Sequence, residues 1–190
     1  MEELNYFTEG WRHIISLDAL DHQLFILVLA ALYTIKDWKQ VLILITAFTI
    51  GHSITLALST LNIISIPTDW IEFLIPCTIV FTAVVNFFTK DLHPRHIRWN
   101  YFLALFFGLI HGLGFANTLR FMLAQDESLA WSLLQFNLGL EAGQIVVVIL
   151  ILVMAYIFIY IIKLNRRYWM WLLSAAGFIV ALKLAIERIP

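Results

Sequence analysis

Six long apolar runs, separated by short polar connections, are the dominant pattern along this chain. They cover about residues 21–36, 39–62, 69–90, 98–124, 130–163 and 168–187. Most of them reach or approach the roughly 20 residues that an α-helix needs to cross a bilayer. Helices are expected because hydrocarbon cannot satisfy an open backbone. The pattern predicts an all-α, polytopic membrane helix bundle of about six transmembrane helices, with residues 1–190 forming a single transmembrane domain.

The residues before the first run are more mixed in polarity. Residues 4–20 combine apolar and charged positions, which predicts a short N-terminal interfacial helix or a reentrant lead-in to the first span. The beginning of the chain is acidic and lacks a basic stretch followed by an apolar core. We therefore expect no cleavable signal peptide.

The composition supports a membrane protein. Hydrophobic residues make up 62% of the 190 residues and charged residues only 13%, whereas apolar residues are about 45–50% of a typical soluble domain. The lipid bilayer is the expected partner, and the net charge of −1 gives no indication of nucleic-acid binding. The single cysteine, Cys77, cannot form a disulfide within the chain.

The distribution of lysine and arginine predicts how the helices are oriented. The first, third and fifth connections hold Lys36, Lys39, Lys90, Arg95, Arg98, Lys163, Arg166 and Arg167. The opposite side holds only Arg12, Arg120, Lys183 and Arg188. Because positively charged loops favour the cytoplasm, we expect these three connections to be cytoplasmic and both termini to lie outside.

Among the ionisable residues of the predicted spans, three stand out by their depth: His52, His111 and Glu141. Such groups in a bilayer centre cost about 2.5 kcal/mol or more, so they are candidates for function. At a rise of 1.5 Å per residue, all three lie roughly 15–18 Å below the outer ends of their spans. Asn137 and Gln144 share a helix face with Glu141. The alternative for each of these residues is a structural hydrogen bond between helices.

Small residues predict which spans pack closely. Gly108 and Gly112 form one pair at a spacing of four residues, and Gly139 and Gly143 form another. Such pairs allow two helix backbones to approach each other. If spans 98–124 and 130–163 meet through these pairs, the histidine of the first comes within reach of the glutamate of the second.

A second polar group lies before the first span, in the stretch HIISLDALDHQLF. It contains His13, Asp18, Asp21 and His22. The last three share a face if the stretch is helical, so we expect them at the outer surface or dipping into the bundle. Asp21 could instead be a helix N-cap, and the two histidines could be interfacial side chains. Glu72 begins the third span on the same outer side, where it could also simply be solvated.

Imidazoles and carboxylates are the usual protein ligands of divalent transition metals such as nickel, cobalt and zinc. The sequence predicts a site for such an ion formed by His13, Asp18, Asp21, His22, His52, His111 and Glu141, supported by Asn137, Gln144 and Glu72. A metal transporter with the ion as substrate is favoured over an enzyme. The alternative is an intramembrane zinc-type hydrolase that uses the same residues to activate water. A metal sensor or partner subunit without flux is a third interpretation.

Four stretches resemble the HupE/UreJ family of small bacterial membrane proteins: HIISLDALDHQLF, TAFTIGHSITLAL, FGLIHGLGFANTL and FNLGLEAGQ. The similarity extends over nearly the whole chain and is that of a divergent branch. It implies an inner-membrane permease for nickel or cobalt that accompanies hydrogenases and ureases, with metalloenzyme-maturation proteins as partners. The metal-handling residues that it implies are Asp21, His22, His52, His111 and Glu141. The sequence leaves open whether the chain forms a homo-oligomer.

Overall fold

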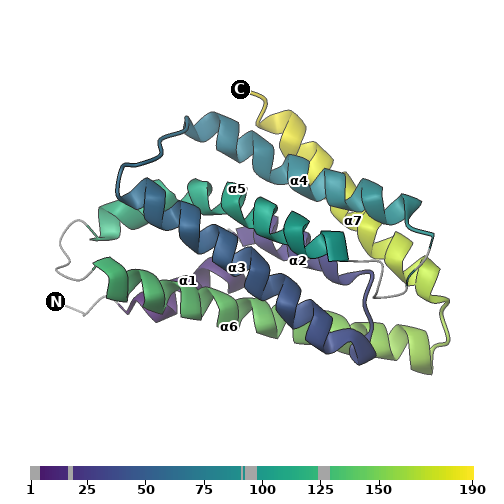
Figure 1. The fold of residues 1–190 in the computed structure, drawn as a ribbon. Helices are drawn as coiled ribbons and strands as arrows, with labels where there is room; N and C mark the ends of the chain where they lie inside the picture. Colours follow the sequence, from purple (N-terminus) through teal and green to yellow (C-terminus); the bar gives the residue numbers. More distant parts are fainter. Residues whose placement is uncertain (1–4, 17–18, 91, 93–97, 124–128) are drawn as a thin grey trace.

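The computed structural model describes residues 5–16, 19–90, 92, 98–123 and 129–190, with side chains undescribed at 98–99 and 116–123. Every regular element within these residues is helical (Figure 1), which confirms the predicted all-α class. The elements are α1 (Tyr6–Ile15), α2 (Leu20–Ala30), the 3₁₀ turn η2 (Ile35–Asp37), α3 (Trp38–Thr60), α4 (Thr68–Phe88), α5 (Arg98–Leu123), α6 (Leu129–Tyr156), its π-helical continuation η4 (Ile157–Ile161) and α7 (Arg166–Glu187).

The structure confirms several membrane-spanning segments but not their exact number. Among the described residues, four segments are long and apolar enough to cross a bilayer: Ile35–Thr60, Thr68–Phe88, Leu129–Ile161 and Arg166–Glu187. A fifth results if α1 and α2, which meet at an angle of 65°, form one broken span. α5 is 26 residues long, Arg98–Leu123, and the part of it with described side chains, Asn100–Phe115, is an apolar helix. A membrane bundle is therefore supported, but the count of six is not confirmed.

The first predicted span, 21–36, is not one continuous helix. α2 ends at Ala30, and a buried polar turn follows it. The Asp37 carboxylate accepts hydrogen bonds from the backbone N–H and the hydroxyl of Thr34, at 3.0 and 2.9 Å. Arg166, at the start of α7, lies 3.5 Å from the same carboxylate oxygen. These interactions satisfy the polar groups of the turn, so the chain can leave the helix within an apolar run.

The segment predicted to be interfacial is a helix inside the bundle. α1 packs lengthwise against α6, and the two helices run in the same direction (Figure 1). A Cβ atom on Gly10 would collide with the backbone oxygen of Phe136, and one on Gly139 would collide with that of Phe7. Only glycines allow this approach. The N-terminal helix is therefore packed on the bundle, and together with α2 it forms either a broken span or the re-entrant lead-in that the sequence predicts.

The glycine pair of α5 packs against α3 instead of α6, which corrects the predicted contact between the two spans. A Cβ atom on Gly108 would collide with the backbone oxygen of Phe48, and one on Gly51 with that of Leu105. α3 and α5 therefore lie in close contact and run in the same direction (Figure 1). Each glycine pair meets a single glycine on another helix, Gly51 on α3 or Gly10 on α1.

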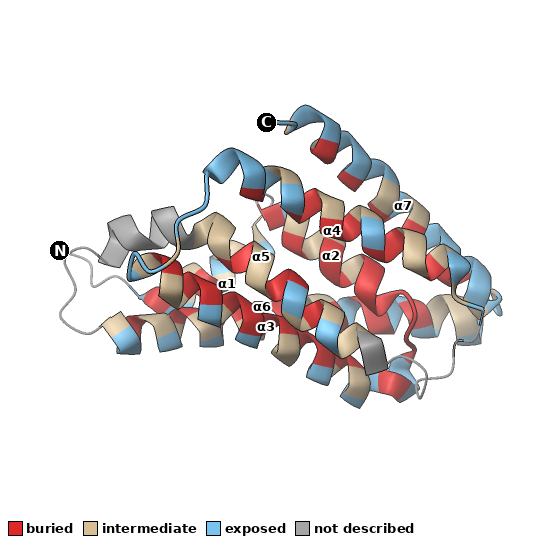
Figure 2. Ribbon diagram, turned by 45° about the horizontal axis from the view of Figure 1, so that its top comes forward, coloured by how far each residue is buried: buried red, intermediate tan, exposed pale blue. Residues whose placement is uncertain are grey.

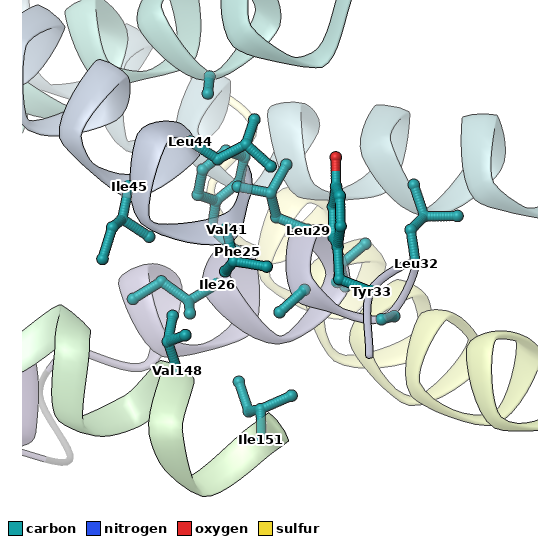
Figure 3. Packing of buried hydrophobic residues seen from close by; sticks show 14 of the residues in the cluster. Phe25, Ile26, Leu29, Leu32, Tyr33, Val41, Leu44, Ile45, Val148 and Ile151 are labelled. Carbon is teal, nitrogen blue, oxygen red and sulfur yellow. The ribbon is translucent and has the colours of Figure 1, made fainter. Parts of the chain in front are cut away.

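Buried side chains line the inner faces of the helices, whereas α7 and the outer face of α6 are largely exposed (Figure 2). Toward the end of the bundle that contains the α2–α3 turn, the interior is mostly apolar, apart from the buried Asn86, which donates to the carbonyl of Val28 and the hydroxyl of Ser174 at 2.8 and 3.0 Å. Figure 3 shows Phe25 and Leu29 of α2 packed with Leu44 and Ile45 of α3 and with Val148 of α6. Each of these five side chains is at most 4% exposed. This apolar cluster closes the bundle at that end.

Candidate metal centre

Three imidazoles from three helices converge in the bundle. His13 of α1, His22 of α2 and His52 of α3 each offer a ring nitrogen, and these atoms all lie within 4.8 Å of one another. The ring centroids of His13 and His22 are 4.8 Å apart, and those of His22 and His52 are 5.8 Å apart. His52 is fully buried and His22 is 6% exposed. Three nitrogen donors gathered in this way form a candidate site for a metal ion.

A fourth imidazole, from His111 of α5, extends the group. Its ring centroid is 5.0 Å from that of His22, and the side chain is fully buried. Its Nε2 lies 3.1 Å from the hydroxyl of Thr78 on α4. The single hydroxyl proton of Thr78 is donated to the carbonyl of Ile75, at 2.7 Å. The hydroxyl must therefore accept from Nε2–H of a neutral His111, which leaves the lone pair on Nδ1 available for a ligand.

Five ring nitrogens of this histidine group are buried and have no hydrogen-bond partner among the described residues. The unpartnered atoms are Nε2 of His13, Nε2 of His22, both ring nitrogens of His52 and Nδ1 of His111. Buried polar atoms in folded proteins are normally satisfied, because each one that is not costs about 1–3 kcal/mol. Several such atoms in one place indicate a site for a ligand that accepts electron pairs, and a metal ion is such a ligand.

The break between α1 and α2 positions two of the imidazoles. His13 lies in the last turn of α1, and His22 lies in the first turn of α2. At the break, the side-chain amide of Gln23 donates to the carbonyls of Ile14 and Ser16, at 2.9 and 3.0 Å. These bonds satisfy carbonyls that the end of α1 leaves free, as a broken helix at membrane depth requires. Sequence analysis missed Gln23, although an amide directly after a His in an apolar run is a usable signal.

Replacing Gln23 by leucine is expected to destabilise the protein by about 1–3 kcal/mol, because the part-buried carbonyl of Ile14 loses this donor and that of Ser16 keeps only the N–H of Ala19. The relative position of His13 and His22 is expected to change as well, so less metal should be retained. Thermal unfolding in detergent and the metal content of the purified protein measure both effects. Gln135→Leu, at a half-buried position of α6, is the control. Wild-type stability in the Gln23 variant would show that the break does not depend on this amide.

A cavity of about 210 Å³ opens beside the histidine group. Its walls are formed by His13, Ala19, Asp21, His22, Glu72, Ile75, His111, Gly114, Phe115 and Arg188. It thus brings two predicted carboxylates, Asp21 and Glu72, to the imidazoles. Asp21 is not the N-cap of α2: Ala19 holds that position, and Oδ2 of Asp21 forms an ion pair with Arg188 at 2.9 Å. Glu72 is exposed at the cavity wall.

Two further predicted residues lie on α6, where it faces α3. Oε1 of Glu141 accepts a hydrogen bond from the hydroxyl of Thr46 at 2.6 Å. Oε1 of Gln144 accepts one from Thr49 at 2.9 Å, and its buried amide nitrogen has no partner. Both threonines precede His52 along α3. These two pairs therefore form a polar α3–α6 contact between the histidine group and the apolar cluster.

Glu141 bonds to Thr46 of α3 and His111 contacts Thr78 of α4, so the expected approach of these two side chains is not among the interactions of the described residues. Asn137, one turn before Glu141, lies next to the His52 ring and donates to the carbonyl of Leu133 at 2.8 Å. Asp18 lies outside the described residues. Of the other predicted residues, Asp21 and Glu72 line the cavity, and Glu141 and Gln144 form the α3–α6 contact.

The chain was also compared with known proteins. A family model described as HupE / UreJ protein matches residues 1–187, which is nearly the whole chain. No curated protein and no solved structure matches it.

Proposed function

The chain belongs to the HupE/UreJ family, and from this membership we propose that it transports a divalent transition-metal ion across the bacterial inner membrane. The ion is nickel or cobalt, with zinc as the third candidate because it takes the same ligands. The observation that carries the proposal is the convergence of four imidazoles, with unpartnered ring nitrogens, at a break in a membrane helix. Broken helices near membrane depth form the substrate sites of many transporters.

The chemistry of the cavity supports selection of such an ion. Imidazole nitrogen suits nickel, cobalt and zinc, whereas magnesium and calcium prefer sites made entirely of oxygen. Asp21 and Glu72 in the cavity wall attract cations from solution. The ion then exchanges part of its water shell for the nitrogens of His13, His22 and His52, with His111 as a fourth donor. The cavity lies at the end of the bundle that the positive-inside rule assigns to the periplasm.

The polar α3–α6 contact provides the oxygen ligands that an ion meets next on its way from the histidine group toward the cytoplasm. An ion that leaves His52 meets the oxygens of Gln144 and Thr49, and then those of Glu141 and Thr46. Beyond them the apolar cluster blocks the way (Figure 3). Release to the cytoplasm therefore requires α2 to separate from α3 and α6. Inward movement of a divalent ion gains roughly 4–5 kcal/mol per 100 mV of membrane potential.

Uptake into proteoliposomes that contain an entrapped fluorescent chelator tests this function. The wild-type protein is expected to take up Ni²⁺ or Co²⁺ at a rate that rises with an inside-negative potential. Glu141→Gln is expected to reduce that rate about tenfold or more, because the carboxylate that offsets the cation's charge between the histidine group and the cytoplasm is lost. Its equilibrium metal affinity should stay close to that of the wild type.

Glu187→Gln is the matched control, because this exposed carboxylate on α7 pairs only with Lys183 among the described residues, at 3.6 Å. Uptake no faster than in protein-free liposomes for all three metals would contradict transport. A Glu141→Gln variant with wild-type flux would contradict the proposed path through the α3–α6 contact.

An intramembrane metal-dependent hydrolase is the second candidate. The observation that favours it is the closure of the bundle below the site by the apolar cluster, since a catalytic centre needs no exit to the cytoplasm. Catalytic zinc takes about three protein ligands and one water, and Glu72 in the cavity wall could serve as a general base. Absence of flux, together with zinc-dependent hydrolysis of a lipid or peptide by the purified protein, would support this alternative.

A further inference from the structure

We propose that the guanidinium of Arg188 pairs with the carboxylate of Asp21 when no metal ion is bound. The competition between Arg188 and the metal ion for this carboxylate then determines which ions enter the histidine site. The inference rests on the transport function proposed above and adds a residue that sets specificity. Arg188 follows the last turn of α7, and its Nη1 lies 2.9 Å from Oδ2 of Asp21 at the start of α2. Both side chains line the 210 Å³ cavity beside His13, His22 and His111.

The ion pair is partly protected from water. The side chain of Arg188 is 31% exposed and that of Asp21 is 17% exposed, so the attraction between them is screened less than in a fully exposed pair. Oδ1 of Asp21 is buried and has no hydrogen-bond partner within the described part of the chain. Arginine often binds a carboxylate through both oxygens, whereas this pair uses only one. The second oxygen of Asp21 therefore remains available to a ligand in the cavity.

Arg188 disfavours binding of a metal cation in the cavity, because it carries a positive charge and has no lone pair with which to bind a metal. While it holds Asp21, the histidine side of the cavity presents neutral imidazoles and a neutralised carboxylate. A cation that enters must either bind without Asp21 or displace the guanidinium. The apparent affinity for metal is then reduced by the fraction of time that Asp21 is free.

This competition affects different ions to different extents. Magnesium and calcium bind through oxygen and gain little from imidazole, so neutralisation of Asp21 by Arg188 leaves Glu72 as the one uncompensated carboxylate that the described cavity wall offers them. Nickel and cobalt can bind the imidazoles first and take Asp21 afterwards. Arg188 is therefore expected to exclude the abundant hard cations at a moderate cost in affinity for transition metals. An ion pair that only held α7 against α2 would neither exclude magnesium and calcium nor lower the affinity for transition metals.

Equilibrium binding of Ni²⁺ to the detergent-solubilised full chain, measured by calorimetry, tests the inference. Arg188→Gln is expected to bind Ni²⁺ about 3- to 10-fold more tightly than the wild type, as expected if Asp21 is free about 10–30% of the time. Millimolar Mg²⁺ should compete with Ni²⁺ in this variant and not in the wild type. In an Asp21→Asn background, Arg188→Gln should leave Ni²⁺ affinity unchanged, because no carboxylate remains to be released.

Lys183→Gln is the control, because it removes a positive charge from the same helix at an exposed position that does not line the cavity. If Arg188→Gln does not fold, Arg188→Lys keeps the charge but loses the planar fork that binds carboxylates, and we expect it to bind Ni²⁺ about twofold more tightly. Affinity at or below the wild-type value in these variants overturns the inference. So does an equal gain in the Asp21→Asn background. If the wild-type protein binds neither nickel, cobalt nor zinc, the transport proposal itself fails.

Discussion

Replacing His52 by alanine is expected to weaken nickel or cobalt binding by about 100-fold or more. The imidazole is fully buried, and neither of its ring nitrogens has a hydrogen-bond partner. Its ring centroid lies 5.8 Å from that of His22 and 6.2 Å from that of His13. Loss of an outer-sphere partner of a metal ligand already costs about 10–100-fold in affinity, so loss of a ligand should cost more. Calorimetry on the purified protein measures the effect.

Two controls separate ligand loss from structural damage. Ser53→Ala changes the next residue of α3, whose hydroxyl bonds only within its own helix, to the carbonyl of Thr49 at 2.7 Å. It should bind metal as the wild type does. His52→Asn fills more of the space left by the imidazole and should restore stability but not affinity. If a folded His52→Ala variant retained wild-type affinity, His52 would not be a ligand.

Replacing Gly108 by leucine is expected to prevent folding or to destabilise the protein by about 3 kcal/mol. A Cβ atom at this position would collide with the backbone oxygen of Phe48, which cannot rotate away as a side chain can. α3 and α5 would have to separate, and forced overpacking of this kind costs typically 1–3 kcal/mol. The separation would also move His52 relative to His111. Yield after detergent extraction and thermal unfolding report the effect.

Gly114→Ala is the matched control on the same helix. Its Cβ atom would lie 3.0 Å from Cδ1 of Ile75, a methyl group at the end of a flexible side chain. A loss of stability well below that caused by Gly108→Leu is therefore expected. If Gly108→Leu unfolded at the wild-type temperature, the close approach of α3 and α5 would be refuted, and with it the placement of the two histidines that these helices carry.

The sequence predicts the helical membrane class because apolar runs of this length have few other stable structures. It also predicts that His52 and His111 face inward, since an imidazole in contact with lipid tails is costly. Both side chains are fully buried. His13 and His22 were identified as candidates from their polar surroundings, and they lie with His52 in one group. That this group binds metal remains a prediction.

Other features depend on residues that are distant in the sequence. The turn after α2 has one local signal, the capping box of Thr34 and Asp37, but its contact with Arg166 of α7 cannot be inferred from neighbouring residues. The glycine pairs identify faces that pack closely but do not identify their partners, which are the single glycines Gly51 and Gly10. This is why Glu141 was expected near His111.

Arg188 was missed for the same reason. Its partner, Asp21, belongs to the other end of the chain, and no periodicity links two residues so far apart. Thr78 was missed because a hydroxyl in a membrane helix usually bonds to its own backbone. Thr78 does so, to Ile75, and its oxygen also meets His111.

X-ray absorption spectroscopy of the protein loaded with one nickel or cobalt ion per chain tests the central claim most directly. We expect a first shell that contains at least three imidazole nitrogens, with the multiple-scattering pattern of histidine rings, and we expect one imidazole fewer or no bound ion in His52→Ala. A first shell made only of carboxylate and water oxygens would contradict the assignment of the histidine group as the metal site.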